Sequence, residues 1–134
     1  MTNPVNYFDW VSRRAKCSPG VMFEALDVAL KQDVESVQRM LQERHNSKLV
    51  FQHARVGNAV VVTRERMDAA NPGTDTVQFS LTSAGITVQR DNTMRFVIVQ
   101  SLNTEGTCKM NVDGQELEIW QVCHKALDGL FFGD

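Results

Sequence analysis

Residues 21–45 read VMFEALDVALKQDVESVQRMLQERH, and the spacing of their apolar side chains decides the fold. An apolar residue recurs every three or four positions along the whole stretch, which is the period of one face of an α-helix. Before the stretch, Ser18 can cap a helix and Pro19 suits its first turn. The pattern predicts one long helix of about 26 residues, either continuous or broken near residues 31–33, and the constant phase favours a continuous helix. The expected buried stripe is Met22, Leu26, Leu30, Val34, Val37 and Leu41.

A shorter helix is expected before this one. Asn3 and Pro4 suit a helix start, and the pattern continues to about Lys16. Arg13, Arg14 and Lys16 form the only tight basic cluster of the chain. Such a cluster is typical of a solvated helix face rather than of a phosphate-binding patch, which needs a denser row of cations.

After residue 46 the period changes to the alternation of β-strands. About seven strands follow, and short turns join most of them; Asp113-Gly114 is the strongest hairpin signal. Parallel pairing needs long crossovers, so the short turns predict an antiparallel meander. Alternating side chains indicate one buried and one solvated face, with Cys108, Met110 and Val112 pointing inward.

The tail, residues 120–134, reads WQVCHKALDGLFFGD. Neighbours on a helix point about 100° apart, so Cys123 and His124 cannot act together as nucleophile and base. Cys123 instead belongs to an apolar helical stripe whose other members are expected to be Ile119 or Trp120, Leu127, and Leu130 or Phe131. We expect this helix, with Trp120, to cover one end of the core, and the terminal phenylalanines to dock on their own chain or on a partner.

These patterns together predict an α+β fold in a single domain, residues 1–134. N-terminal helices (residues 1–46), including the long amphipathic one, pack against a strongly twisted, roughly seven-stranded antiparallel meander (residues 47–120). A short C-terminal helix (residues 121–132) closes the domain.

Composition narrows the class of protein. The net charge is −2, and 43% of the residues are hydrophobic, which is ordinary for a soluble globular domain. We find no secretory signal pattern and no apolar run long enough for a membrane helix. The three cysteines, at positions 17, 108 and 123, are odd in number and scattered, so we expect no disulfide framework. These features favour a reduced, cytoplasmic protein that does not associate with membranes.

The sequence carries no recognisable catalytic constellation. It lacks the glycine-rich nucleotide loops and the nucleophile-elbow motif of common enzyme classes. Its cysteines and histidines lack the paired spacing of metal ligands. We therefore expect no catalytic residues, no metal and no cofactor.

The favoured hypothesis is a non-enzymatic protein-binding or regulatory module, acting on a protein partner or as a homodimer. Its partner-facing residues are expected in the basic cluster, in the second strand, in the loop of residues 67–75, and at the C-terminus. They are Arg13, Arg14, Lys16, Arg64, Arg66, Asn71 and Phe132.

The alternative hypothesis is a small-molecule-binding protein or small enzyme. The curved sheet would enclose an apolar pocket lined by His53, Cys108 and Trp120. Nucleic-acid binding is the least favoured option, because the basic cluster is small.

Overall fold

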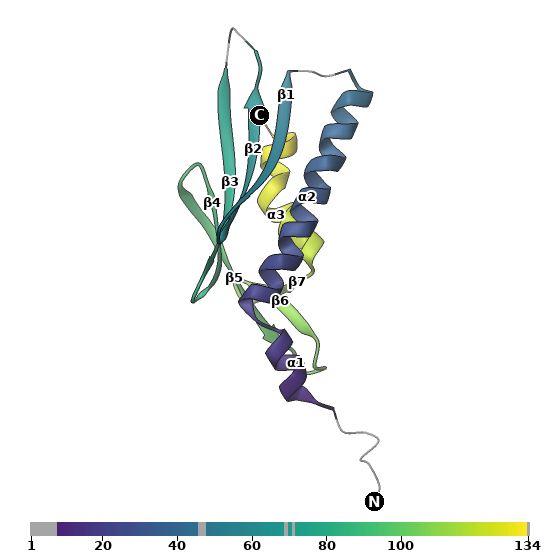
Figure 1. The fold of residues 1–134 in the computed structure, drawn as a ribbon, viewed down its shortest axis with the longest axis vertical. Helices are drawn as coiled ribbons and strands as arrows, with labels where there is room; N and C mark the ends of the chain where they lie inside the picture. The colour runs from purple at the N-terminus through teal and green to yellow at the C-terminus, as the bar shows by residue number, and fades with distance from the viewer. Residues whose placement is uncertain (1–7, 46–47, 69, 71, 134) are drawn as a thin grey trace, which may run out of the picture.

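Figure 1 shows the computed structural model of the chain, which describes residues 8–45, 48–68, 70 and 72–133. Two helices lead, an antiparallel sheet follows, and one helix closes the chain, so the predicted α+β class is confirmed. The elements are α1 (Trp10–Lys16), α2 (Pro19–Glu43), β1 (Leu49–Val56), β2 (Ala59–Arg66), β3 (Gly73–Thr82), β4 (Gly85–Arg90), β5 (Thr93–Leu102), β6 (Cys108–Val112), β7 (Gln115–Leu117) and α3 (Ile119–Phe132).

The sheet is the predicted meander. Its spatial order is β1-β2-β3-β4-β5-β6-β7, and each strand pairs antiparallel with the next one in sequence. The turn between β6 and β7 has φ of 53° at Asp113 and 79° at Gly114. A tight hairpin turn that needs positive φ at both central residues favours an Asp-Gly pair, which explains why this turn could be read from the sequence.

Helix α2 is continuous through residues 31–33. The Ser18 hydroxyl accepts a hydrogen bond from the Val21 N–H at 3.3 Å, and Pro19 occupies the first turn, as expected. Five of the six predicted stripe residues are buried, but Met22 is only half-buried and Phe23 takes its place in the core. The larger ring faces the sheet, while Met22 lies beside Cys108, with 3.8 Å between the two sulfur atoms.

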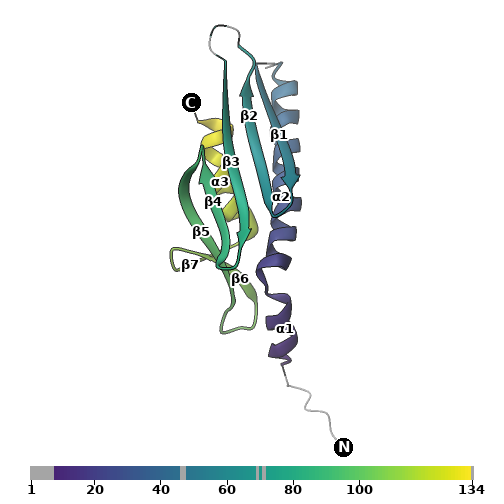
Figure 2. The same cartoon turned by 60° about the vertical axis from the view of Figure 1, so that its left-hand side comes forward.

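Helix α1 begins later than predicted. The Asp9 carboxylate caps it by accepting a hydrogen bond from the Ser12 N–H at 3.1 Å. The expected start at Asn3 and Pro4 lies outside the described residues. In both Figure 1 and Figure 2, α1 lies at the lower end of the molecule, beside the lower ends of β5 and β6 and away from the end where β3 and α2 reach highest.

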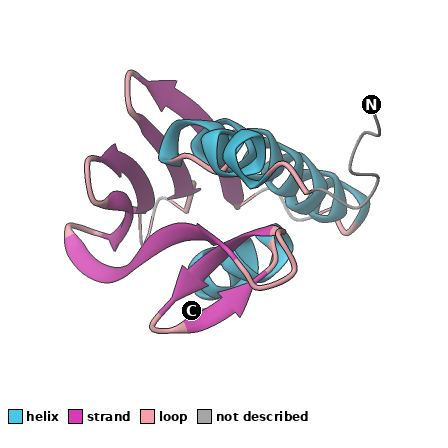
Figure 3. Cartoon of the chain, turned by 90° about the horizontal axis from the view of Figure 1, so that it is seen from below, coloured by secondary structure: helices cyan, strands magenta, loops and turns pink. Residues whose placement is uncertain are grey.

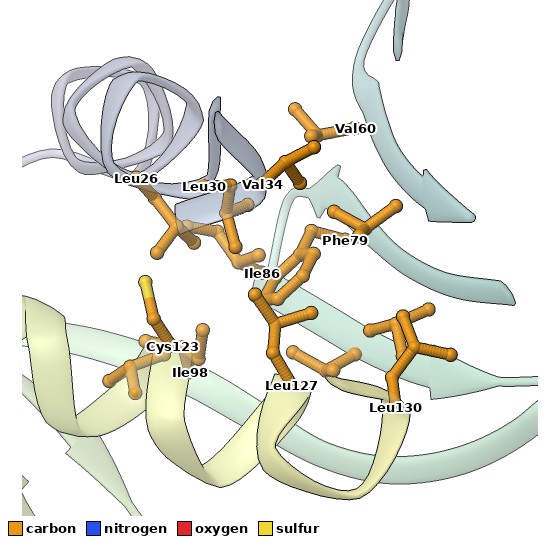
Figure 4. Packing of buried hydrophobic residues seen from close by; sticks show 14 of the residues in the cluster. Leu26, Leu30, Val34, Val60, Phe79, Ile86, Ile98, Cys123, Leu127 and Leu130 are labelled. Atoms are coloured by element: carbon orange, nitrogen blue, oxygen red, sulfur yellow. The ribbon is translucent and has the colours of Figure 1, made fainter. Parts of the chain in front are cut away.

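The sheet curls around the two larger helices. Seen from below, the strands form a curve, with α2 and α3 on its inner side (Figure 3). Alternate residues of β2 to β6 point to that side and pack with both helices in one hydrophobic core. Figure 4 shows Leu26, Leu30 and Val34 of α2 facing Phe79 and Ile86 of the sheet and Leu127 of α3. Helical side chains therefore occupy the inner side of the sheet, where the alternative hypothesis placed an apolar pocket.

The C-terminal helix departs from the prediction at Trp120. The last strand ends at Leu117, and the Glu118 N–H donates a 2.7 Å hydrogen bond to the side-chain oxygen of Gln121 as α3 begins. This start turns Ile119 toward the core and leaves Trp120 66% exposed. The stripe is therefore completed by Ile119, and the expectation that Trp120 covers the core is wrong.

The expectation that no cysteines pair is also wrong. Cys17, directly after α1, and Cys108, at the start of β6, form a disulfide across a sequence separation of 91 residues. Single-sequence spacing cannot reveal a bond between two isolated cysteines, because the fold brings them together. Cys123 is the remaining free thiol.

Candidate functional site

A groove with a largely apolar lining lies between α2 and α3. It has a volume of about 360 Å³. Its apolar lining comes from both helices, and two carboxylates also line it, the exposed Asp128 and the half-buried Asp33. The apolar lining residues are Val37, Met40, Trp120, Leu127, Phe131 and Phe132.

The outer face of α3 forms one side of this groove. Trp120, His124, Asp128 and Phe132 follow at intervals of four, which places them on one face of a helix. The indole and imidazole ring centroids of Trp120 and His124 are 6.5 Å apart, and His124 Nε2 lies 3.8 Å from Asp128 Oδ1. This face therefore displays aromatic and polar groups in a fixed row.

The two terminal phenylalanines have different environments. The Phe131 ring meets Phe51 of β1 edge-on, with centroids 5.0 Å apart, so it docks on its own chain. Phe132 stays 64% exposed. With Trp120, it leaves large aromatic surface in water at both ends of the outer face of α3, and such surface is typical of interaction sites.

Cys123 lies on the inner face of α3, where it is buried. Burial raises the pKa of its thiol to about 12, and the nearby Asp33 carboxylate contributes in the same direction. Desolvation likewise raises the pKa of Asp33, although its contact with the thiol lowers it. A cysteine is a nucleophile only as a thiolate, and the raised pKa favours the neutral thiol of this buried residue.

The basic cluster lies on α1. Arg13, Arg14 and Lys16 are exposed, and no residue of α1 is buried. Trp10 and Val11 are 57% and 55% exposed, so this helix presents apolar and basic groups to the outside. Phe8, just before α1, lies over Gly106, where an added Cβ would come within 2.4 Å of the ring.

Arg64 has a different environment from the one expected of a partner-binding residue. It is 3% exposed, and its guanidinium donates to the Asp75 carboxylate, to Leu130 O at 2.9 Å and to Gly133 O at 3.2 Å. Arg64 therefore fastens the end of α3 to the sheet, and we exclude it from the partner-facing surface. Arg66 is half-buried at the end of β2, and Asn71 lies outside the described residues.

His53, Cys108 and Trp120 occupy three separate environments. His53 Nε2 lies 2.6 Å from Asp27 Oδ1 of α2, Cys108 is bonded to Cys17, and Trp120 lines the groove. No hydrogen bond, ion pair or ring contact joins any two of these three described residues. The structure therefore does not bring the proposed pocket residues together.

The sequence patterns did not predict that residues of α2 and α3 together form a groove. Its α2 wall consists of the edge of the core stripe, Val37 and Met40, together with Asp33 and Ser36. Only the contact between α2 and α3 makes these residues neighbours of Trp120. The four-residue spacing of the outer face of α3 was a signal in the sequence that could have revealed the other wall.

Among the described residues, no helix is long and apolar enough to cross a membrane. Over the same residues, no group of three or more histidine, cysteine, aspartate or glutamate side chains is arranged to hold a metal ion. Comparison with family models, with curated proteins and with solved structures finds no match to this chain.

Proposed function

We propose that the chain is a non-enzymatic protein-binding module that takes a short helix of its partner into the groove between α2 and α3. The observation that carries this proposal is the apolar groove flanked by exposed Trp120 and Phe132. Grooves between helices commonly bind an amphipathic helix through a few apolar anchors, and tryptophan is enriched among the residues that dominate binding energy.

The charges of the groove indicate which helix it takes. Among the described residues, the groove is lined by two carboxylates, Asp33 and Asp128, and by no lysine or arginine, so a helix that combines apolar anchors with positive charge is complementary. Helix α1 has this character, with Trp10 and Val11 exposed beside Arg13, Arg14 and Lys16. We therefore propose that α1 of a second copy of the chain is the occupant.

A chain cannot fill its own groove in this way. Helix α1 ends at Lys16, close to the start of α2 at Pro19, whereas the groove begins near Asp33 and extends past Val37. Eighteen residues of helix separate Pro19 from Val37, a rise of about 27 Å. The disulfide at Cys17 fixes α1 at the opposite end of α2. Exchange of α1 between two protomers, by contrast, would bury both exposed surfaces in a closed two-fold dimer.

Variants of the groove test this proposal by sedimentation equilibrium over a range of protein concentrations. Trp120→Ala and Phe132→Ala are each expected to weaken dimerisation by roughly tenfold or more, because removal of a central aromatic anchor costs ~2 kcal/mol. Val28→Ala is the matched control, since Val28 is 59% exposed on α2 but does not line the groove. A wild-type chain that stays monomeric, or a dimer that both groove variants leave intact, would contradict the proposal.

The cytoplasmic location stays a prediction, and the disulfide weighs against it. Disulfides persist in oxidising compartments and are rare in the cytosol. Rapid alkylation of the protein inside its native cells, followed by mass spectrometry, measures whether Cys17 and Cys108 are bonded there. If both carry the alkyl group, the reduced cytoplasmic state is supported; if the bond is retained, an oxidising compartment is supported.

A further inference from the structure

A second hollow, of about 330 Å³, lies between the sheet and α3. Residues 67–134 carry four lysines and arginines against nine aspartates and glutamates. Lys109 pairs with Glu118, and the other three cations, Arg90, Arg95 and Lys125, all line this hollow. The three remaining positive charges of this more acidic half of the chain therefore all lie at the hollow.

The bottom of the hollow is apolar. Val77 and Val88, each 1% exposed, and Phe96, 6% exposed, belong to the hydrophobic core and also line the hollow. The Lys125 ammonium lies 5.4 Å from the centroid of the Phe96 ring, so one cation stands directly over an apolar wall. A ligand in this hollow meets an apolar surface below and cations around it.

The positive charge at the hollow is poorly compensated by the protein. Arg90 Nε lies 3.9 Å from Asp91 Oδ2, at the outer limit of an ion pair. Among the described residues, no carboxylate lies within 4.0 Å of the charged group of Arg95 or of Lys125. Cations held near one another without counter-charge repel, and a bound anion removes that repulsion.

Helix α3 makes room for one of these cations. A Cβ placed on Gly129 would lie 2.8 Å from Arg90 Nη1, so the guanidinium rests against the bare backbone of the helix. Glycine is unfavourable inside a helix relative to alanine. The glycine leaves the space that the Arg90 guanidinium occupies at the hollow, and an added methyl group would require that flexible side chain to shift.

We propose that this hollow binds a phosphate monoester carried on an apolar group. The phosphate lies between Arg90, Arg95 and Lys125, and the apolar group packs on the floor of the hollow at Phe96. Arginine and lysine both form charge-assisted hydrogen bonds with phosphate oxygens. The site is independent of the proposed dimer, because Lys125, Ala126 and Gly129 lie on a different face of α3 from Trp120, His124 and Asp128.

Titration of the oxidised full-length chain with phenyl phosphate, followed by NMR and calorimetry, tests the proposal. Saturable binding that shifts the signals of Phe96, Ala126 and Gly129 is expected. Inorganic phosphate is expected to bind at least tenfold more weakly, because it leaves the apolar surface uncovered. If inorganic phosphate binds as tightly as phenyl phosphate, the apolar half of the proposal is wrong.

Variants identify the cations that carry the binding. The double variant Arg95→Ala, Lys125→Ala is expected to lose binding by roughly a hundredfold, about tenfold for each charge-assisted contact removed. Its matched control is Lys31→Ala, Arg39→Ala, which removes two exposed cations of α2 that line neither the hollow nor the groove. Gly129→Ala displaces Arg90 and is expected to weaken binding while leaving the circular dichroism spectrum unchanged. Equal losses in the double variant and its control would overturn the assignment of the site.

The same chemistry occurs in a soluble phosphate ester and in a phospholipid headgroup. Sedimentation with vesicles of phosphatidic acid, compared with vesicles of phosphatidylcholine, distinguishes these two sources. Binding of phenyl phosphate alone identifies a soluble ligand, and binding of phosphatidic acid vesicles identifies a lipid; either result supports the site if the double variant abolishes it. Binding of neither probe overturns the proposal.

Discussion

Helices α1 and α2 follow one another in the chain and both carry large apolar side chains, yet only α2 buries them. Six residues of α2 are buried in the core, whereas α1 buries none and leaves Trp10 57% exposed. The difference lies in what faces each helix: α2 meets the inner side of the sheet and α3, while α1 meets only the lower end of β5 and the disulfide to β6. Apolar spacing predicts that a helix has a face to bury, but burial also needs a broad opposing surface, and the contacts of α1 within the chain are too few to bury any of its residues.

The largest loss of stability is expected from a substitution in the buried face of α2. Leu30 is 0% exposed in the core, and Leu30→Ala is expected to lower the free energy of unfolding by about 4 kcal/mol through lost burial and the cavity left behind. Val28→Ala, on the exposed side of the same helix, is expected to change it by less than about 0.5 kcal/mol. Urea denaturation measures both values, and similar losses in the two variants would refute the assignment of the buried face.

The disulfide is the covalent attachment of α1. The double variant Cys17→Ala, Cys108→Ala is expected to lose about 3 kcal/mol, because the bond constrains a long loop in the unfolded chain. Trypsin is also expected to cleave after Arg13 and Arg14 faster, since α1 has no buried residues to hold it. A reducing agent should lower the stability of the wild-type chain by a similar amount and leave the double variant unchanged. A reducing agent without effect on the wild type would show that the bond does not form.

The core and Arg64 both hold the end of α3. Loss of the Arg64 side chain is expected to have an intermediate effect on the free energy of unfolding. Arg64→Ala is expected to lower the free energy of unfolding by about 2 kcal/mol, because it leaves three acceptors of the buried guanidinium without their donor. Asp75 is 37% exposed and can be solvated, which limits the loss. Arg66→Ala, two residues along β2, is the control and is expected to have an effect below about 0.5 kcal/mol. Thermal and urea unfolding measure the difference, and equal effects of the two variants would contradict the role of Arg64.

The smallest effect on stability is expected from α1 itself. Trp10→Ala should change the free energy of unfolding of the monomer by less than about 0.5 kcal/mol, since the indole contacts mainly solvent. The same variant is expected to weaken self-association by roughly tenfold, because the indole anchors α1 in the groove of the partner copy. Urea unfolding of dilute protein and sedimentation equilibrium separate the two effects. A large loss of monomer stability would show that α1 packs on its own chain.

Local chemistry explains which parts of the fold could be predicted. The α2 stripe, the cap at Ser18 and the Asp113-Gly114 turn depend on residues close in sequence, so periodicity and turn preferences identify them. The choice of Phe23 over Met22 could not be made in this way, because both fit the helical period to within one residue. It depends on which side chain the sheet faces.

The misassigned site residues share a different cause. Arg64 in a sequence is a cation that could face a partner, and only the arrival of α3 at β2 gives its guanidinium two backbone acceptors, Leu130 O and Gly133 O. Cys17 and Cys108 are single cysteines that the fold brings together across 91 residues. The groove and the cationic hollow depend in the same way on contacts between α3 and distant elements, and such contacts are invisible to single-sequence patterns.

The most direct test of the account is an intermolecular NMR contact between α1 and the groove. In a mixed sample of carbon-13-labelled and unlabelled chains, isotope-filtered spectra detect only contacts between two copies. We expect cross-peaks from the Val11 methyl groups of one protomer to the Trp120 ring of the other. A dimer whose intermolecular cross-peaks arise elsewhere, for example at Val97 and Val99 on the outer face of β5, or a chain that shows no intermolecular cross-peaks at millimolar concentration, would contradict the exchange of α1.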